Sequence, residues 1–173
     1  MSTPTTLRPP RPRRLAFKLF VLLGVVLVVQ AVWTPVVLQL SGSVERGVWV
    51  RLPRAVTVGD HVFFAAPESV RDTLTDHGYP ADTRLFKPVM AGPGAVVTTT
   101  DGECRVDGVV GGEMDRVTSQ GHALPRVEFD GELAPGQWWV LSEKPASVDS
   151  RCFGPLSESE AKGPYVLLWS WGR

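Results

Sequence analysis

The segment from residue 15 to residue 40, LAFKLFVLLGVVLVVQAVWTPVVLQL, carries a single charged side chain, Lys18. As a helix it is long enough to cross about 30 Å of hydrocarbon, and Lys18 is near enough to its end to reach water. The alternative is a cleaved secretory signal, but the apolar run exceeds the usual ~7–15 residues and no convincing small-residue cleavage site follows it. We therefore predict a single transmembrane anchor over residues 15–40.

The flanks of this segment predict its orientation. Residues 1–14 contain no acidic residue, and they combine several prolines with four arginines, Arg8, Arg11, Arg13 and Arg14. Such a composition predicts a basic arm that is disordered in water. The positive-inside rule then places the arm in the cytoplasm and residues 41–173 on the other side of the membrane.

The part that follows the anchor reads as one mainly β domain. Short runs rich in β-branched and aromatic residues are separated by glycine and proline turns; the runs are GVWVRL, VGDHVFFAA, LFKPVMA, AVVTTT, CRVDGVV, QWWVL and YVLLWSW. One segment differs, because Pro67 suits the first position of a helix and Gly78 suits its end. We predict an antiparallel β domain with a short helical insertion over residues 67–78.

Charge and cysteine content narrow the functional classes. The 18 basic and 18 acidic residues give a formal net charge of zero and are spread along the chain, which argues against a nucleic-acid partner. Cys104 and Cys152 are the only cysteines. A disulfide between them is allowed in an oxidising compartment, but the sequence does not show one. Neither has a second ligand at zinc-site spacing, so no metal site and no cofactor are expected.

Two serines, Ser41 and Ser43, stand directly after the predicted anchor, and a serine is a weak nucleophile unless a base activates it. The three histidines do not form a catalytic-triad signature. His61 reads as one polar position on a strand, His77 flanks a helix end, and His122 lies in a turn-like stretch.

A lysine is the other candidate base. Lys87 interrupts the apolar run RLFKPVMA, where it faces either solvent or the core. If it faces inward, desolvation lowers the pKa of its amine and allows a neutral general base. A turn-rich loop follows the strand QWWVL, and it contains Ser147 together with the opposite charges of Asp149 and Arg151. Each of these features alone fits an ordinary surface.

Taken in order, three segments resemble the type I signal peptidase family, S26-like enzymes built on a Ser-Lys dyad. They are SGSV at residues 41–44, FKPVMAGPG at residues 86–94, and SVDSR at residues 147–151 followed by FGP. RGVW at residues 46–49 and SQGHALP at residues 119–125 are similar to motifs of the conjugative-transfer branch, the TraF-type signal peptidases. The likeness covers nearly the whole chain after the basic arm.

The resemblance implies a role for each matching residue. Ser43 would be the nucleophile and Lys87 its general base, with Ser147 orienting the lysine amine. The Ser41 hydroxyl and the Ser43 backbone N–H would form the oxyanion hole. The same likeness assigns Asp149 and Arg151 a structural role in the loop that carries Ser147.

The implied function is a membrane-bound serine endopeptidase that cleaves leader peptides or pilin precursors at the outer face of a bacterial inner membrane. It would be a single-pass protein with its N-terminus in the cytoplasm and residues 41–173 as a periplasmic peptidase domain, and its partners would be a precursor peptide and the lipid bilayer. Two alternatives stay open: a catalytically inactive, membrane-tethered assembly factor of a conjugation or secretion machine, and a binding module with an incidental SGS linker.

Two positions depart from the family pattern. Glu45 stands where a proline is usual, and Ala95 replaces the aspartate of the usual PGD turn. Neither change removes a residue of the proposed dyad. Both bear on substrate preference and efficiency.

Overall fold

The computed structural model of the chain describes residues 17–18, 20–24, 36–40, 44–100, 102–113, 115–118 and 121–171. The chain divides into two units, Met1–Pro35 and Val36–Arg173, and the second is called the β domain below. Residues 20–24 of the first unit are helical. Within the described ranges, no helix combines the length and the apolar character that crossing a membrane requires.

The larger sheet of the β domain has seven strands in the order β1-β2-β11-β3-β4-β9-β10. Every neighbouring pair in it is antiparallel. The strands are β1 (Val36–Gln39), β2 (Gly47–Arg51), β3 (His61–Ala65), β4 (Arg84–Ala91), β9 (Gln137–Val140), β10 (Leu156–Ser157) and β11 (Lys162–Ser170). In this order, strand β4, which carries Lys87, lies between β3 and β9.

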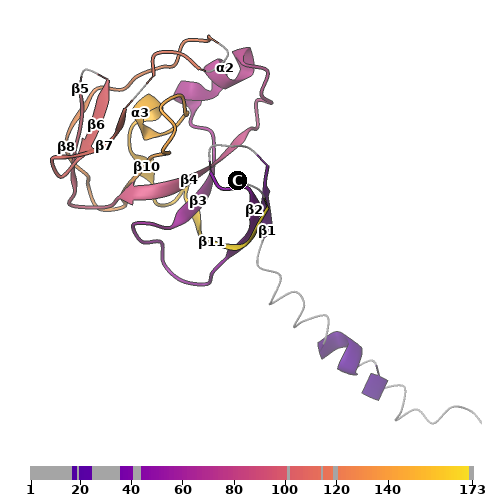
Figure 1. Cartoon of the computed structure of the whole chain (residues 1–173). Coiled ribbons are helices and arrows are strands. Elements are labelled where there is room, and N and C mark those ends of the chain that lie inside the picture. The colour runs from indigo at the N-terminus through magenta and orange to yellow at the C-terminus, as the bar shows by residue number, and fades with distance from the viewer. Residues whose placement is uncertain are drawn as a thin grey trace, which may run out of the picture. The chain divides into compact units, whose positions relative to one another are not determined.

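A second, antiparallel sheet has the order β7-β6-β5-β8. It contains β5 (Val96–Thr100), β6 (Glu103–Val106), β7 (Val109–Glu113) and β8 (Phe129–Glu132). Strand β4 leads into it through a tight turn in which Gly94 adopts φ of 87°, a left-handed value that glycine tolerates without steric cost. In Figure 1 this sheet lies at the end of β4, to the left of the seven-stranded sheet.

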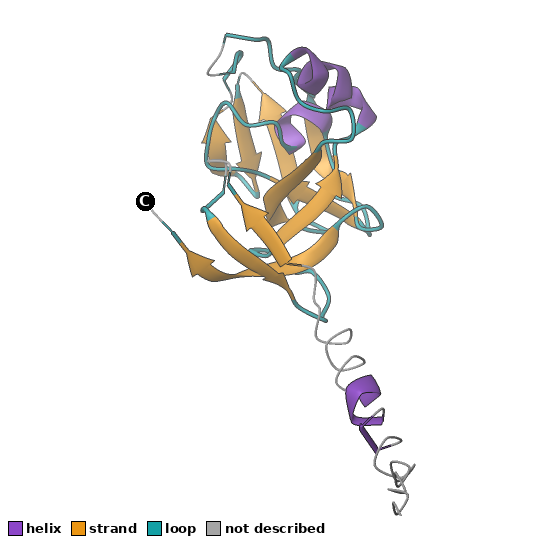
Figure 2. Ribbon diagram, turned by 90° about the vertical axis from the view of Figure 1, so that its right-hand side faces the viewer, coloured by secondary structure: helices purple, strands orange, loops and turns teal. Residues whose placement is uncertain are grey.

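Two short helices lie side by side at one end of the β domain (Figures 1 and 2). Helix α2 (Glu68–Asp76) directly follows Pro67, and Gly78 with φ of 81° lies just after its end. It occupies the predicted helical insertion. Helix α3 (Ser150–Phe153) begins inside the loop for which no helix was expected.

The core consists of several apolar clusters. One consists of side chains of the seven-stranded sheet, among them Val62, Val89 and Val140. Another lies between the two sheets and includes Val97, Trp139 and Leu141. A third cluster joins α2 to α3 through Val70, Leu74 and Cys152. The prediction of a mainly antiparallel β domain is confirmed.

One boundary of the predicted anchor is wrong. Residues 36–39 were expected to end a helix, but they form strand β1, which pairs with β2 from Val36↔Val50 to Gln39↔Gly47. The β-branched pair Val36 and Val37 favours a strand, and a partner strand is available to satisfy its backbone groups. Residues 36–39 were included in the predicted helix because they are as apolar as the residues before them. The prediction of a disordered basic arm over residues 1–14, and the anchor prediction for residues 15–16, 19 and 25–35, lie outside the described residues.

The disulfide that the sequence left open is not formed. Cys104 and Cys152 are both free and buried. Cys104 packs into the cluster between the two sheets, whereas Cys152 packs into the cluster beneath α2, so the two thiols face different parts of the core. Burial raises the pKa of both thiols, that of Cys152 to about 11, so both stay protonated near neutral pH.

Candidate functional site

Lys87 lies in the middle of β4 and points into the protein. It pairs with Val62 of β3, a fully buried residue, and its own side chain is only 4% exposed. Its Nζ atom donates a hydrogen bond of 2.5 Å to Ser147 Oγ, across 60 residues of sequence. Of the two orientations that the sequence left open for Lys87, the structure shows the inward one.

Burial lowers the pKa of Lys87 from 10.5 to about 8. Desolvation of the ammonium is the largest cause, and the nearby positive charge of Arg151 acts in the same direction. The carboxylate of Asp149 opposes the shift by stabilising the ammonium. A substantial fraction of the amine is therefore neutral at mildly alkaline pH, as a general base requires.

An ion pair shapes the loop that carries Ser147. Arg151 Nη2 lies 2.6 Å from Asp149 Oδ2, and both side chains are fully buried. Asp149 also caps α3 by accepting from the Arg151 backbone N–H, and it accepts a further hydrogen bond of 3.1 Å from Ser142 N. The carboxylate thus ties the start of the loop to its end.

The guanidinium of Arg151 connects this loop to its surroundings. It donates to the backbone carbonyls of Ser142 and Lys144 on the loop itself. It also donates to the carbonyl of Glu113, at the end of strand β7 of the second sheet. Because these carbonyls come from separate segments, Arg151 fixes the Ser147 loop against the smaller sheet.

Cys152 supports Ser147 from below. Its thiol contacts the Ser147 carbonyl oxygen at 3.7 Å, and the Ser147 N–H bonds to Lys144 O at 3.2 Å. The sequence suggested only disulfide chemistry for this cysteine, and apart from the apolar Phe153 that follows it, no local signal indicated its packing role. Ser147 is therefore held through its backbone on both sides while its hydroxyl accepts from Lys87.

The proposed nucleophile Ser43 and its neighbour Ser41 lie outside the described residues. The described chain resumes at Val44, three residues before β2 begins. Of the two departures from the family pattern, Glu45 is exposed. Ala95 closes the turn after β4 by donating to Gly92 O at 3.1 Å, so this turn forms without the usual aspartate.

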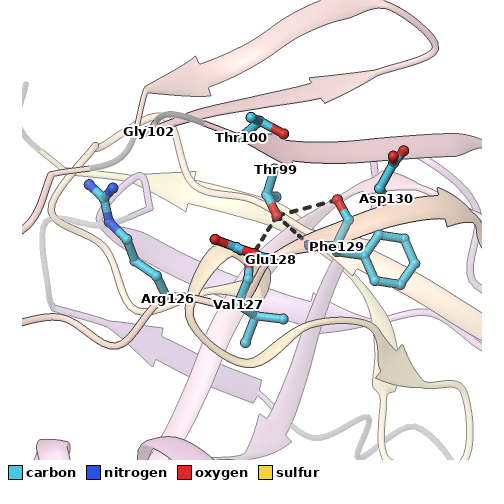
Figure 3. A pocket seen from close by; sticks show the side chains of 8 residues that line it. All are labelled: Thr99, Thr100, Gly102, Arg126, Val127, Glu128, Phe129 and Asp130. Carbon is cyan, nitrogen blue, oxygen red and sulfur yellow. Dashed lines mark hydrogen bonds between the residues drawn. The ribbon is translucent and has the colours of Figure 1, made fainter.

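A pocket of about 410 Å³ opens elsewhere, on the second sheet (Figure 3). It is lined by Thr99, Thr100, Gly102, Arg126, Val127, Glu128, Phe129 and Asp130. The hydroxyl of Thr99 is already hydrogen-bonded within the protein: it donates to Val127 O and accepts from Phe129 N, both at 2.7 Å. Neither Lys87 nor Ser147 lines this pocket. We assign the chemistry to the lysine site because it holds a buried amine whose pKa is lowered to about 8.

The described residues include no group of three or more histidine, cysteine, aspartate or glutamate side chains that could hold a metal ion. His77 and His122 do stack, with ring centroids 4.4 Å apart, but they form only a pair.

The lowered pKa of His61 makes the stability of the folded protein depend on pH. His61 lies on β3, and its ring packs at a tilt against the ring of Trp49, with the ring centroids 4.3 Å apart. Burial lowers the pKa of His61, and the carboxylate of Asp60 opposes this. The unfolded chain takes up a proton near pH 6.5, whereas the folded protein does so only at lower pH. His61 therefore favours the folded state fully above about pH 6.5, and this contribution is lost as the pH falls through the folded pKa.

We expect the urea midpoint to fall between pH 7 and pH 5, and to fall less in His61→Phe, which keeps an aromatic ring at the stack. The measurement is urea unfolding of both proteins at a series of pH values. An identical pH dependence in the two proteins would rule out this role for His61.

The chain is similar to a known protein family and to a solved structure. The family model described as "Signal peptidase, peptidase S26" matches residues 13–171. Among solved structures, a signal peptidase I from Enterococcus faecalis aligns with 20% sequence identity and a TM-score of 0.40, covering 64% of this chain and 97% of that chain. No curated protein matches the sequence significantly.

Proposed function

The chain belongs to the signal peptidase family, peptidase S26, and on this premise we propose that it is a membrane-bound serine endopeptidase with Ser43 as nucleophile and Lys87 as general base. The observation that carries the proposal is the buried Lys87 amine, 2.5 Å from Ser147 Oγ, with its pKa lowered to about 8. An exposed lysine would keep its proton at neutral pH and could not act as a base.

In the proposed reaction, the neutral Lys87 amine takes the proton of the Ser43 hydroxyl as Ser43 Oγ attacks the scissile carbonyl. The Ser41 hydroxyl and the Ser43 N–H stabilise the oxyanion. Lys87 then gives its proton to the leaving amine, which departs and leaves an acyl-enzyme on Ser43. Water, deprotonated by Lys87, attacks the ester and restores both side chains.

Ser147 serves this reaction by orienting the amine. Its hydroxyl accepts from Nζ in the structure, and its backbone is held by Lys144 and Cys152. The Asp149–Arg151 pair keeps that backbone in place. In this proposal the pair takes no part in proton transfer.

We also propose a location, which is supported by the composition of the N-terminal segments. We place the basic arm in the cytoplasm, the apolar segment up to residue 35 in a bacterial inner membrane, and the peptidase domain in the periplasm. Ser43 follows the apolar segment by eight residues, so a precursor with its own hydrophobic helix would present a cleavage site near the same face of the membrane. Such an arrangement raises the effective concentration of substrate at the nucleophile.

Within the family we propose that the chain belongs to the TraF-type, conjugative-transfer branch and matures a pilin precursor. The support is the set of local motifs around residues 46–49 and 119–125. Joining the new peptide end to the other end of the same chain, in place of hydrolysis, uses the same acyl-enzyme with an amine as the attacking group.

The test uses the full-length protein in lipid vesicles with a precursor that carries an apolar helix and a small residue before the cleavage site. Cleavage is followed by mass spectrometry, and the acyl-enzyme is trapped by acid quenching and located by peptide mapping. We expect an adduct on Ser43 and none in Ser43→Ala. A precursor that stays intact with folded, inserted protein would favour the inactive assembly factor, and an adduct on another residue would reject the assignment of Ser43.

A further inference from the structure

We propose that Trp49 is a positioning residue, which holds the turn after Ser43 in register with the strand that carries Lys87. This inference rests on the proposed function. Its first support is a hydrogen bond of 3.1 Å from Trp49 Nε1 to Glu45 O. Glu45 lies two residues after Ser43 in the sequence, so the indole restrains the backbone just beyond the nucleophile.

The indole also contacts the lysine strand. Trp49 is 4% exposed, and its ring meets the ring of Phe86 edge-on with centroids 5.1 Å apart. Phe86 directly precedes Lys87 on β4. One side chain therefore contacts the turn that follows the nucleophile and the residue that precedes the base.

No backbone hydrogen bonds between β2 and β4 fix the position of one strand relative to the other. Strand β2, which follows the nucleophile turn, and strand β4 are separated in the sheet by β11 and β3. The rings of Tyr165 on β11 and His61 on β3 complete the cluster, at 5.6 Å and 5.5 Å from Phe86. The aromatic cluster thus crosses the two intervening strands and gives β2 and β4 a direct side-chain contact.

The hydrogen bond to Glu45 O has a particular use in this chain. A proline at position 45 would fix φ near −65° and stiffen the turn by itself. Glu45 does not restrict the backbone in this way. The Trp49 indole, four residues later in the chain, restrains the Glu45 backbone by donating to its carbonyl. This hydrogen bond compensates for the absence of a proline ring at position 45.

The test compares Trp49→Phe with Trp138→Phe in full-length protein in lipid vesicles. Trp49→Phe keeps an aromatic ring at this position, and it removes the donor to Glu45 O together with part of the indole's volume. Trp138 is a matched control, because it is also a buried tryptophan on a strand, but among the described residues no acceptor lies within hydrogen-bond reach of its Nε1. The readouts are kcat and KM for a precursor peptide and amide hydrogen exchange of residues 41–46.

We expect Trp49→Phe to lower kcat about tenfold with little change in KM, because a displacement of the nucleophile well below 1 Å already slows a reaction that depends on alignment. Exchange of residues 41–46 should become faster. Trp138→Phe should leave kcat and this exchange unchanged, even if it lowers the melting temperature as much.

Unchanged kcat and unchanged exchange in Trp49→Phe would overturn the inference while the proposed peptidase activity stands. An equal loss of kcat in Trp138→Phe would overturn it as well, since the effect would then follow general destabilisation. If the wild-type protein does not cleave, the proposed function fails, and exchange alone decides: faster exchange in Trp49→Phe supports the inference, and equal exchange rejects it.

Discussion

Replacing Lys87 by methionine is expected to reduce precursor cleavage by about 10⁴-fold or more, and at the same time to raise the melting temperature at pH 7. Activity is lost because methionine cannot accept the Ser43 proton. The expected gain in stability has a different origin. At pH 7 the buried amine is largely protonated, and holding that ammonium away from water destabilises the folded state.

The size of the gain follows from the pKa. Lowering a lysine pKa from 10.5 to about 8 corresponds to roughly 3 kcal/mol of disfavoured ammonium. Methionine fills a similar volume without a charge, and the loss of the hydrogen bond to Ser147 offsets part of the gain. For a domain of this size, a net gain of 1 kcal/mol raises the melting temperature by about 2–4 °C.

The matched control for this variant is Lys162→Met, which changes an exposed lysine on strand β11. Both activity and melting temperature should stay near the wild-type values. Cleavage at the wild-type rate by Lys87→Met would remove the proposed base. A melting temperature well below that of the wild type would show that the buried lysine stabilises the fold, the opposite of the expected effect.

Removing the carboxylate of Asp149 has the largest expected effect on stability. Asp149→Ala leaves the guanidinium of Arg151 buried without its counter-charge, which typically costs about 3–5 kcal/mol. It also removes the cap of α3 and the acceptor of Ser142 N. Chemical unfolding should show this loss as a large fall in the midpoint, and cleavage should fall as the Ser147 loop loses its shape.

A surface ion pair provides the control. Arg105 and Glu103 lie 2.7 Å apart, close to the 2.6 Å of the buried pair, but both are nearly half exposed. Glu103→Ala should therefore change stability by less than about 1 kcal/mol. A double variant, Asp149→Leu with Arg151→Met, should be less destabilised than Asp149→Ala, because no unpaired charge stays buried. Equal effects of Asp149→Ala and Glu103→Ala would contradict the role assigned to the buried pair.

Most of the strands and the helical insertion could be predicted because each of them carries a local signal. The runs at residues 61–65 and 84–91 combine β-branched and aromatic residues between turn signals, and Pro67 and Gly78 mark the ends of α2. Strand β8 was missed, since FDGE holds two acids and a glycine and is selected only by pairing with β5. The same applies to β1, whose hydropathy matched the anchor while its structure depended on β2.

Part of the candidate site could also be predicted from the sequence, and part could not. The apolar residues beside Lys87 made an inward orientation possible, but they did not establish it, because a lysine on a strand points to solvent in most proteins. The buried network of Arg151 could not be predicted from local pattern at all. Its partners at Glu113 and Lys144 are backbone carbonyls, which leave no mark on the sequence. The contact of Trp49 with Glu45 O has the same character.

The proposed mechanism depends on a single property, the pKa of the Lys87 amine in the folded protein. Nuclear magnetic resonance titration of the lysine side chains, in full-length protein in lipid vesicles and with Lys87→Met to assign the signal, measures it directly. We predict that Lys87 titrates near pH 8 and that kcat/KM rises with pH through the same value, as the amine loses its proton. A Lys87 signal that titrates near 10.5, the ordinary value for a lysine, or a cleavage rate that is flat across pH 7–9, would contradict the proposed mechanism.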